Sequence, residues 1–228
     1  LCLPRISNYD DLDPLSQEKN VSLKMLKAGE AIPGDARLVI IPGSKATIAD
    51  LNFIKEQKWD IDLLAHLNRG NFVLGICAGY QMLGNYIDNT QGQEGSPSMV
   101  EGLKILDVDT ILTTQKTLTR VSAKHVISDI NFEGYEIHIG KTKGNDCDRP
   151  FATVNKKNEG AVSKNGSVMG SYLHGMFEND EFRSNFLNQI GFESSDLNYS
   201  KNVDQSLNDF ADFLEENINV SEIFDKAY

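Results

Sequence analysis

The first 90 residues alternate between short apolar runs and longer stretches in which apolar residues recur every three or four positions. The runs at 38–41 and 72–76 are continuously apolar, as expected of parallel strands covered on both faces. The stretches 47–57 and 60–68 predict helices, with apolar positions on one side at Ile48, Leu51 and Ile54 and at Ile61, Leu64 and Leu67. This rhythm predicts an α/β fold with a mostly parallel central sheet and helices on both faces.

The pattern changes after residue 84. Alternating or apolar runs predict strands at 118–126, 135–139, 151–154 and 168–172. Lys164–Ser167 is typical of a hairpin turn, because asparagine and glycine tolerate positive φ. An earlier segment, 21–26, also alternates like a strand, and a helix is predicted at 178–190. The second half therefore predicts an antiparallel extension of the sheet.

The last predicted helix, 204–218, carries an apolar stripe made of Leu207, Phe210, Leu214 and Ile218. Its other positions are mostly polar, which favours a solvated outer helix. With 228 residues the chain is long enough for one large α/β domain. We therefore predict one domain over 1–192, with 193–228 as its C-terminal helical extension.

Composition narrows the possible partners. A formal net charge of −11 disfavours nucleic acid and anionic membrane surfaces, and no apolar run approaches a membrane span. Cys2, Cys77 and Cys147 are too scattered for a disulfide framework or a metal site, which suits a reducing cytoplasm. The opening Leu1–Arg5 is not a signal peptide, so we expect the chain to begin inside a longer protein.

One stretch, 71–84, combines a predicted buried strand with the opening of a helix. Between them Gly75-x-Cys77-x-Gly79 has the spacing of a nucleophile elbow, with sulfur in place of a hydroxyl. Glycines are needed where a sharp strand-to-helix turn brings two backbones together. A helix N-terminus also favours the thiolate. The alternative is a buried structural cysteine, and the flanking glycines favour the nucleophile.

A cysteine nucleophile needs a base that accepts and returns a proton. Of the four histidines, His66 and His125 fall inside predicted elements and are interpreted as structural or surface residues. His174 follows a predicted strand, at the kind of strand end where α/β sites collect. His138 is the competing candidate, and spacing alone leaves both open.

An oxyanion hole needs backbone N–H donors beside the nucleophile. Ala78 offers one, and Gly43, in the loop after the strand 38–41, is a candidate for the second or else an ordinary turn glycine. Gly140-Lys141-Thr142 superficially resembles a phosphate-binding loop. However, a phosphate-binding loop has four residues between its two glycines, whereas five residues separate Gly134 from Gly140. The stretch is also predicted as a strand rather than a loop, so no ATP site is expected in this chain.

Together these motifs resemble the class I, triad-type glutamine amidotransferases, and specifically the C-terminal glutaminase halves of the cobyric acid synthase family. The matching stretches, in family order, are Leu3–Asn8, Ile41–Leu51, Gly75–Gly84, Gly134–Gly140 and Ser171–Phe177. The Pro42–Lys45 loop and Tyr135–His138 are the most specific of them. The resemblance implies a flavodoxin-like α/β fold.

The resemblance also implies roles for matching positions. Cys77 would be the nucleophile and His174 the base, while Gly43 and Ala78 would line the oxyanion hole. Gln81 would help to hold the substrate glutamine, and Tyr135 would lie beside it.

The sequence departs from the family pattern at two positions. Ala78 stands where glycine is usual, which keeps the N–H. Many relatives carry a glutamate two residues after the histidine, and here that position is Met176. A Cys–His dyad is therefore expected, with Glu136, Glu178 or Asp180 as speculative orienting groups.

The implied reaction is hydrolysis of L-glutamine to supply ammonia for amidation of corrinoid carboxylates in cobalamin biosynthesis. ATP and Mg²⁺ would be used by an N-terminal synthetase half of the same protein, which this sequence lacks. One alternative is a glutaminase serving another acceptor, such as a cell-wall lipid precursor, against which the Pro42–Lys45 loop speaks. The other is a non-catalytic binding module with the same fold.

Overall fold

The computed structural model describes residues 1–219, 223 and 226. At its centre a four-stranded sheet has the order β1 (Leu38–Ile41), β2 (Phe72–Ile76), β10 (Val168–Ser171) and β9 (Ala161–Val162). The first three strands are parallel, and β9 pairs antiparallel with β10 through the predicted hairpin turn. The mostly parallel central sheet is thus confirmed.

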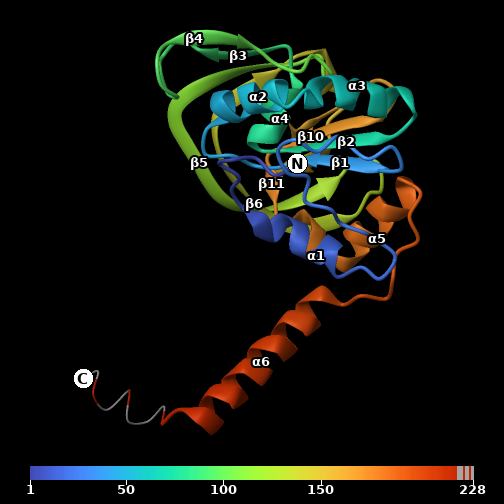
Figure 1. Ribbon diagram of the computed structural model, residues 1–228, viewed down its shortest axis with the longest axis vertical. Coiled ribbons are helices and arrows are strands. Elements are labelled where there is room, and N and C mark those ends of the chain that lie inside the picture. Colours follow the sequence, from blue (N-terminus) through green and yellow to red (C-terminus); the bar gives the residue numbers. More distant parts are fainter. Residues whose placement is uncertain (220–222, 224–225, 227–228) are drawn as a thin grey trace.

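Helices cover both faces of this sheet (Figure 1). On one face lie α2 (Thr47–Glu56), α3 (Trp59–Asn68) and α4 (Ala78–Leu83). On the other lie α1 (Asp13–Ser16) and α5 (Asp180–Gln189). Along β2, Val73 packs into the core on the first face, whereas Leu74 and Ile76 pack into the second. The strand is buried on both faces, which explains its continuous apolar run.

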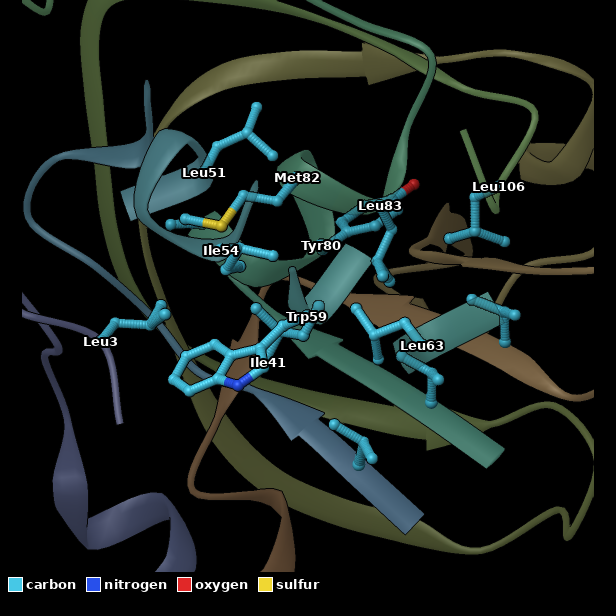
Figure 2. Packing of buried hydrophobic residues seen from close by; sticks show 14 of the residues in the cluster. Leu3, Ile41, Leu51, Ile54, Trp59, Leu63, Tyr80, Met82, Leu83 and Leu106 are labelled. Atoms are coloured by element: carbon cyan, nitrogen blue, oxygen red, sulfur yellow. The ribbon is translucent and has the colours of Figure 1, made fainter. Parts of the chain in front are cut away.

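The first core joins α2, α3 and α4 to the sheet (Figure 2). Leu51, Ile54, Trp59, Met82 and Ile41 are fully buried there. On the second face, Phe182, Phe186 and Leu187 of α5 make the corresponding core. The predicted stripe of α2 is confirmed at Leu51 and Ile54.

The antiparallel extension is a second sheet of seven strands. Its main path is β11 (Leu173–His174), β6 (Asn131–Lys143), β5 (Asp109–His125), β3 (Tyr86–Asn89) and β4 (Ser98–Glu101). The strand β7 (Ala152–Val154) pairs with β5, and β8 (Lys157–Glu159) pairs with β7. Short 3-10 helices complete the chain at η1 (Tyr9–Leu12), η2 (Asn145–Asp148) and η3 (Met176–Glu178). The strands β5 and β6 form a long curved hairpin beside the first sheet (Figure 1).

Two local predictions were wrong. Residues 21–26 form no strand, although they alternate between exposed and partly or fully buried positions, because no neighbouring strand pairs with them. In α3 the buried side is Trp59, Leu63 and His66, whereas Ile61 and Leu64 are 59% and 51% exposed. The helix begins at Trp59, whose side chain fixes the buried stripe at the fourth and seventh residues that follow.

The C-terminal helix α6 (Tyr199–Asn217) is confirmed as a helix, and it projects away from the two sheets (Figure 1). None of its residues is buried, so its apolar stripe is solvated. Residues 220–222, 224–225 and 227–228 of the predicted extension lie outside the described residues. None of the described helices has the length and apolar character needed to cross a membrane.

Candidate functional site

The elbow at Cys77 has the predicted geometry. β2 ends at Ile76, α4 begins at Ala78, and Cys77 between them has φ 53° and ψ −110°, which is strained for a residue with a side chain. A Cβ on Gly79 would lie 1.9 Å from the Ile41 carbonyl oxygen, and one on Gly75 would lie 2.7 Å from Gly79 backbone atoms. The two glycines are therefore required by backbone contact.

Backbone contacts fix the cysteine on both sides. Its N–H donates to the Ser171 carbonyl oxygen of the neighbouring strand β10 at 2.8 Å. Its thiol donates to the Ile137 carbonyl oxygen of β6, with 3.1 Å between sulfur and oxygen. Cys77 thus lies where the two sheets meet, and it is 7% exposed.

His174 stands at the end of β11, on the other side of this junction. Its Nδ1 lies 2.6 Å from Oδ2 of Asp11. Burial opposes a charge on the ring, but the hydrogen bond to Asp11 and the nearby Cys77 side chain outweigh it and raise the pKa of His174 to about 10. Nε2, the other ring nitrogen, is buried without a hydrogen-bond partner among the described residues. The structure therefore brings the two predicted residues together and favours an imidazolium beside the thiol.

Asp11 is the group that sequence reasoning missed. It lies in η1, its side chain is 3% exposed, and its second oxygen accepts the Gly175 N–H at 2.8 Å. The carboxylate therefore holds both the imidazole and the backbone that follows it. It orients His174 in the way that the third member of a catalytic triad does.

The orienting groups suggested from sequence were wrong. Asp180 accepts hydrogen bonds from the Arg183 guanidinium and from the Tyr199 N–H. Within the described residues, neither Glu136 nor Glu178 forms a hydrogen bond with His174. The nearest sequence signal is the matching stretch Leu3–Asn8, which ends three residues before Asp11.

The N-terminal segment reaches the site by pairing with the loop after β1. Ile6 forms an antiparallel bridge with Ser44, and the Ser7 N–H donates to the Gly43 carbonyl oxygen at 3.0 Å. A Cβ on Gly43 would come within 3.2 Å of the His174 ring, so this glycine lies against the base. The loop and the start of α4 place Gly43 and Ala78 at the same site, where their donor roles stay predictions.

Two further predicted residues are engaged within the protein. Gln81 is buried, and its amide nitrogen donates to the Ile139 carbonyl oxygen at 2.8 Å and to the Tyr172 hydroxyl at 3.2 Å. The Tyr135 ring stacks on His174, with centroids 5.3 Å apart, and its hydroxyl accepts from Asn8. Direct contact of either residue with glutamine stays a prediction.

The competing histidine has a different environment. His138 stacks on Tyr172 with ring centroids 3.8 Å apart, and burial lowers the pKa of His138 to about 4. It is therefore neutral near pH 7, and the geometry favours His174 as the base. The stretch that resembles a phosphate loop lies inside strand β6, as predicted. Across the described residues, no group of three or more His, Cys, Asp or Glu side chains is arranged to hold a metal ion.

Sequence comparison shows which known proteins the chain resembles. The CobB/CobQ-like glutamine amidotransferase domain family matches residues 1–182. The cobyric acid synthase of Jannaschia sp. is 53% identical over 225 residues, which are 99% of this chain and 47% of that protein. That of Cereibacter sphaeroides is 52% identical over 221 residues, which are 97% of this chain and 46% of that protein. The chain thus spans about half the length of these relatives.

Solved structures share the fold at low identity. One described as a glutamine amidotransferase superposes with a TM-score of 0.59 at 16% identity, covering 79% of this chain and 90% of its own. The structure of PurLQS from Thermotoga maritima gives a TM-score of 0.56 at 14% identity, covering 92% and 95%. These likenesses confirm the α/β fold class.

Proposed function

The chain belongs to the CobB/CobQ-like glutamine amidotransferase family, and we propose that it hydrolyses the side-chain amide of L-glutamine. The observation that carries the proposal is the His174 ring, which is hydrogen-bonded to Asp11 and lies near the Cys77 side chain. A thiol on a strained elbow, a histidine beside it and a carboxylate that orients the histidine are the parts that thiol-based acyl transfer needs.

In the first half of the reaction, the Cys77 thiolate attacks the amide carbon and a C–S bond forms. The negative charge that develops on the amide oxygen is stabilised by the backbone N–H groups of Gly43 and Ala78. Protonated His174 gives its Nε2 proton to the amide nitrogen, the C–N bond breaks, and ammonia leaves. Asp11 keeps the ring in place through Nδ1 while the Nε2 proton moves.

In the second half, neutral His174 accepts a proton from water. The resulting hydroxide attacks the glutamyl thioester, the C–S bond breaks, and glutamate and the Cys77 thiolate are restored with protonated His174. The stacked Tyr135 ring limits rotation of the imidazole throughout. Gln81 is hydrogen-bonded to Ile139 and Tyr172 and lies on the helix that begins directly after the nucleophile, where it would contact the bound glutamine.

We further propose that the ammonia is used by a second, ATP- and Mg²⁺-dependent half of a longer protein to amidate corrinoid carboxylates. The support is the similarity to cobyric acid synthases, of whose length this chain spans about half. A dyad was expected from the sequence, and the contact with Asp11 supports a triad instead.

Replacing Cys77 by alanine tests the proposal. Glutamine hydrolysis by the Cys77→Ala chain should fall to background, and a glutamine-analogue electrophile should label Cys77 in the wild-type chain, read as a mass increase on that peptide. The Cys2→Ala chain is the control, because Cys2 lies outside the site, and it should hydrolyse glutamine at the wild-type rate. Wild-type hydrolysis by Cys77→Ala, or an unlabelled Cys77 in the wild type, would contradict the proposal, and the second result would favour a non-catalytic module.

A further inference from the structure

Between β10 and β11 the chain passes from the four-stranded sheet to the seven-stranded sheet through one residue. β10 ends at Ser171 in the four-stranded sheet, and β11 begins at Leu173 in the seven-stranded sheet, so Tyr172 alone connects them. We call Ser171–Leu173 the sheet junction. His174 follows it directly, and the Ser171 carbonyl oxygen accepts the Cys77 N–H at 2.8 Å. The nucleophile is therefore hydrogen-bonded to the first residue of the junction, and the base follows its last residue in the sequence.

One buried side chain, Glu159 at the end of β8, binds this junction with both carboxylate oxygens. Oε1 accepts the Tyr172 N–H at 2.6 Å, and Oε2 accepts the Ser171 hydroxyl at 2.9 Å. The Ser171 hydroxyl in turn accepts the Leu173 N–H at 3.0 Å. The carboxylate and the hydroxyl together hold all three residues of the junction.

The junction also supports the floor of the site. The Tyr172 hydroxyl is 2.6 Å from the Thr142 hydroxyl and accepts from the Gln81 amide at 3.2 Å. Its ring stacks on His138 and packs edge-on against Tyr80. A shift of Tyr172 would therefore disturb His138 and also Gln81, which lies on the helix that begins directly after Cys77.

Glu159 has no cationic partner among the described ion pairs, and it is 7% exposed. Burial raises the pKa of Glu159 to about 7, although the Tyr172 and Ser171 hydrogen bonds favour the charged form. It lines a cavity of about 580 Å³ whose other titratable groups are Tyr80, Glu136, His138, Lys141, Cys147, Lys157 and Tyr172. Burying a carboxyl without a counter-ion is unfavourable, which indicates that Glu159 has a role at the junction other than stabilising the fold.

We propose that Glu159 is a positioning residue, which holds the sheet junction so that the Cys77 thiol and the His174 ring keep their alignment for glutamine hydrolysis. The inference rests on the proposed function. Glu159 forms its hydrogen bonds with the Ser171 hydroxyl and the Tyr172 N–H, and not with the Cys77 thiol or the His174 ring, so it acts through the junction.

The test compares Glu159→Gln with Lys157→Gln. Glutamine at 159 keeps the size of the side chain but replaces one acceptor oxygen by an NH₂ group, so one junction donor loses its partner. Lys157 is on the same strand, lines the same cavity and does not bind the junction, so its variant controls for loss of a charge. Because small misalignments of reacting groups slow catalysis strongly, kcat should fall about tenfold in Glu159→Gln while KM changes less than about twofold. Lys157→Gln should match the wild type in both.

A second readout does not depend on glutamine. The rate at which iodoacetamide alkylates Cys77 at pH 7, followed by mass spectrometry of its peptide, should fall several-fold in Glu159→Gln, because the pairing with His174 is loosened. Equal kcat and equal alkylation in Glu159→Gln and Lys157→Gln would overturn the inference. So would a Glu159→Gln chain that does not fold, or whose lost activity follows its lost folded fraction, because Glu159 would then serve stability alone. An inactive wild-type chain that still shows the alkylation difference would instead contradict the proposed function.

Discussion

The four-stranded sheet supplies the nucleophile from a central strand buried on both faces, whereas the seven-stranded sheet supplies the base from a two-residue strand at its edge. Cys77 is held by close backbone packing, at Gly75 and Gly79. The strand that carries His174 has only two residues and cannot fix it by backbone packing. Two carboxylates hold it instead: Asp11 binds the imidazole ring, and Glu159 binds the sheet junction that precedes it. One half of the site is therefore fixed by packing and the other by polar contacts.

The largest effect should come from disturbing the packed half. In Gly79→Ala the new methyl group would lie 1.9 Å from the Ile41 carbonyl oxygen, which neither backbone can avoid without moving β1 or α4. We expect a loss of about 4 kcal/mol or more in the free energy of unfolding, measured by urea denaturation. Gly34→Ala is the control, because nothing lies within 4 Å of a Cβ there, and it should change stability by less than about 0.5 kcal/mol. Similar stability of both variants would show that packing does not fix the elbow.

The next effect tests the polar half. Asp11→Asn keeps the size of the side chain but removes the charge that stabilises the imidazolium, so glutamine hydrolysis should fall about 100-fold. The pKa of His174 should also move down from about 10, because the hydrogen bond to Asp11 raises it, and NMR titration of the ring measures this. Asp13→Asn, an exposed acid two residues away, should leave both quantities unchanged. Unaltered activity in Asp11→Asn would leave a Cys–His dyad as the working site.

The smallest effect concerns the acid stability of the seven-stranded sheet. His125 on β5 is 1% exposed against Phe151 and Phe182, and burial lowers the pKa of His125 to about 4. A lowered folded-state pKa means that its contribution is present above the unfolded value of about 6.5 and is lost as the pH falls toward 4. His125→Phe should therefore lose about 2 kcal/mol less stability than the wild type between pH 7 and pH 4, measured by urea denaturation. Parallel losses in the two chains would mean that other groups set the acid sensitivity.

The two sheets also differ in how well the sequence predicts them. The strand β2 is buried on both faces, and β1 is buried on one face and partly buried on the other, so both have continuous apolar runs. The extents of the two helices between them were predicted to within one residue at each end. In β5 the segment 115–120 is mostly exposed, and only the part from Leu118 onward was predicted. A polar, solvated stretch of strand has no pattern that separates it from a loop.

The site shows the same limit. Cys77 and its glycines were recognisable because the elbow is a local motif in which spacing itself reflects geometry. Asp11 and Glu159 carry no such pattern. They come to the site through a bridge at Ile6 and Ser44 and through the pairing of β8 with β7, and only the folded chain shows these contacts.

The contact between Asp11 and His174 closes a loop of 163 residues. Contacts so distant along the chain form late in folding, because the entropy of closing the loop opposes them until the intervening elements are in place. During synthesis the elbow around Cys77 is complete roughly a hundred residues before His174 is added. Asp11, which is made earlier still, also has no partner until then. A nascent chain that ends before His174 therefore carries a cysteine without an acid–base partner. Glutamine hydrolysis would show that the domain has folded from Asp11 through His174.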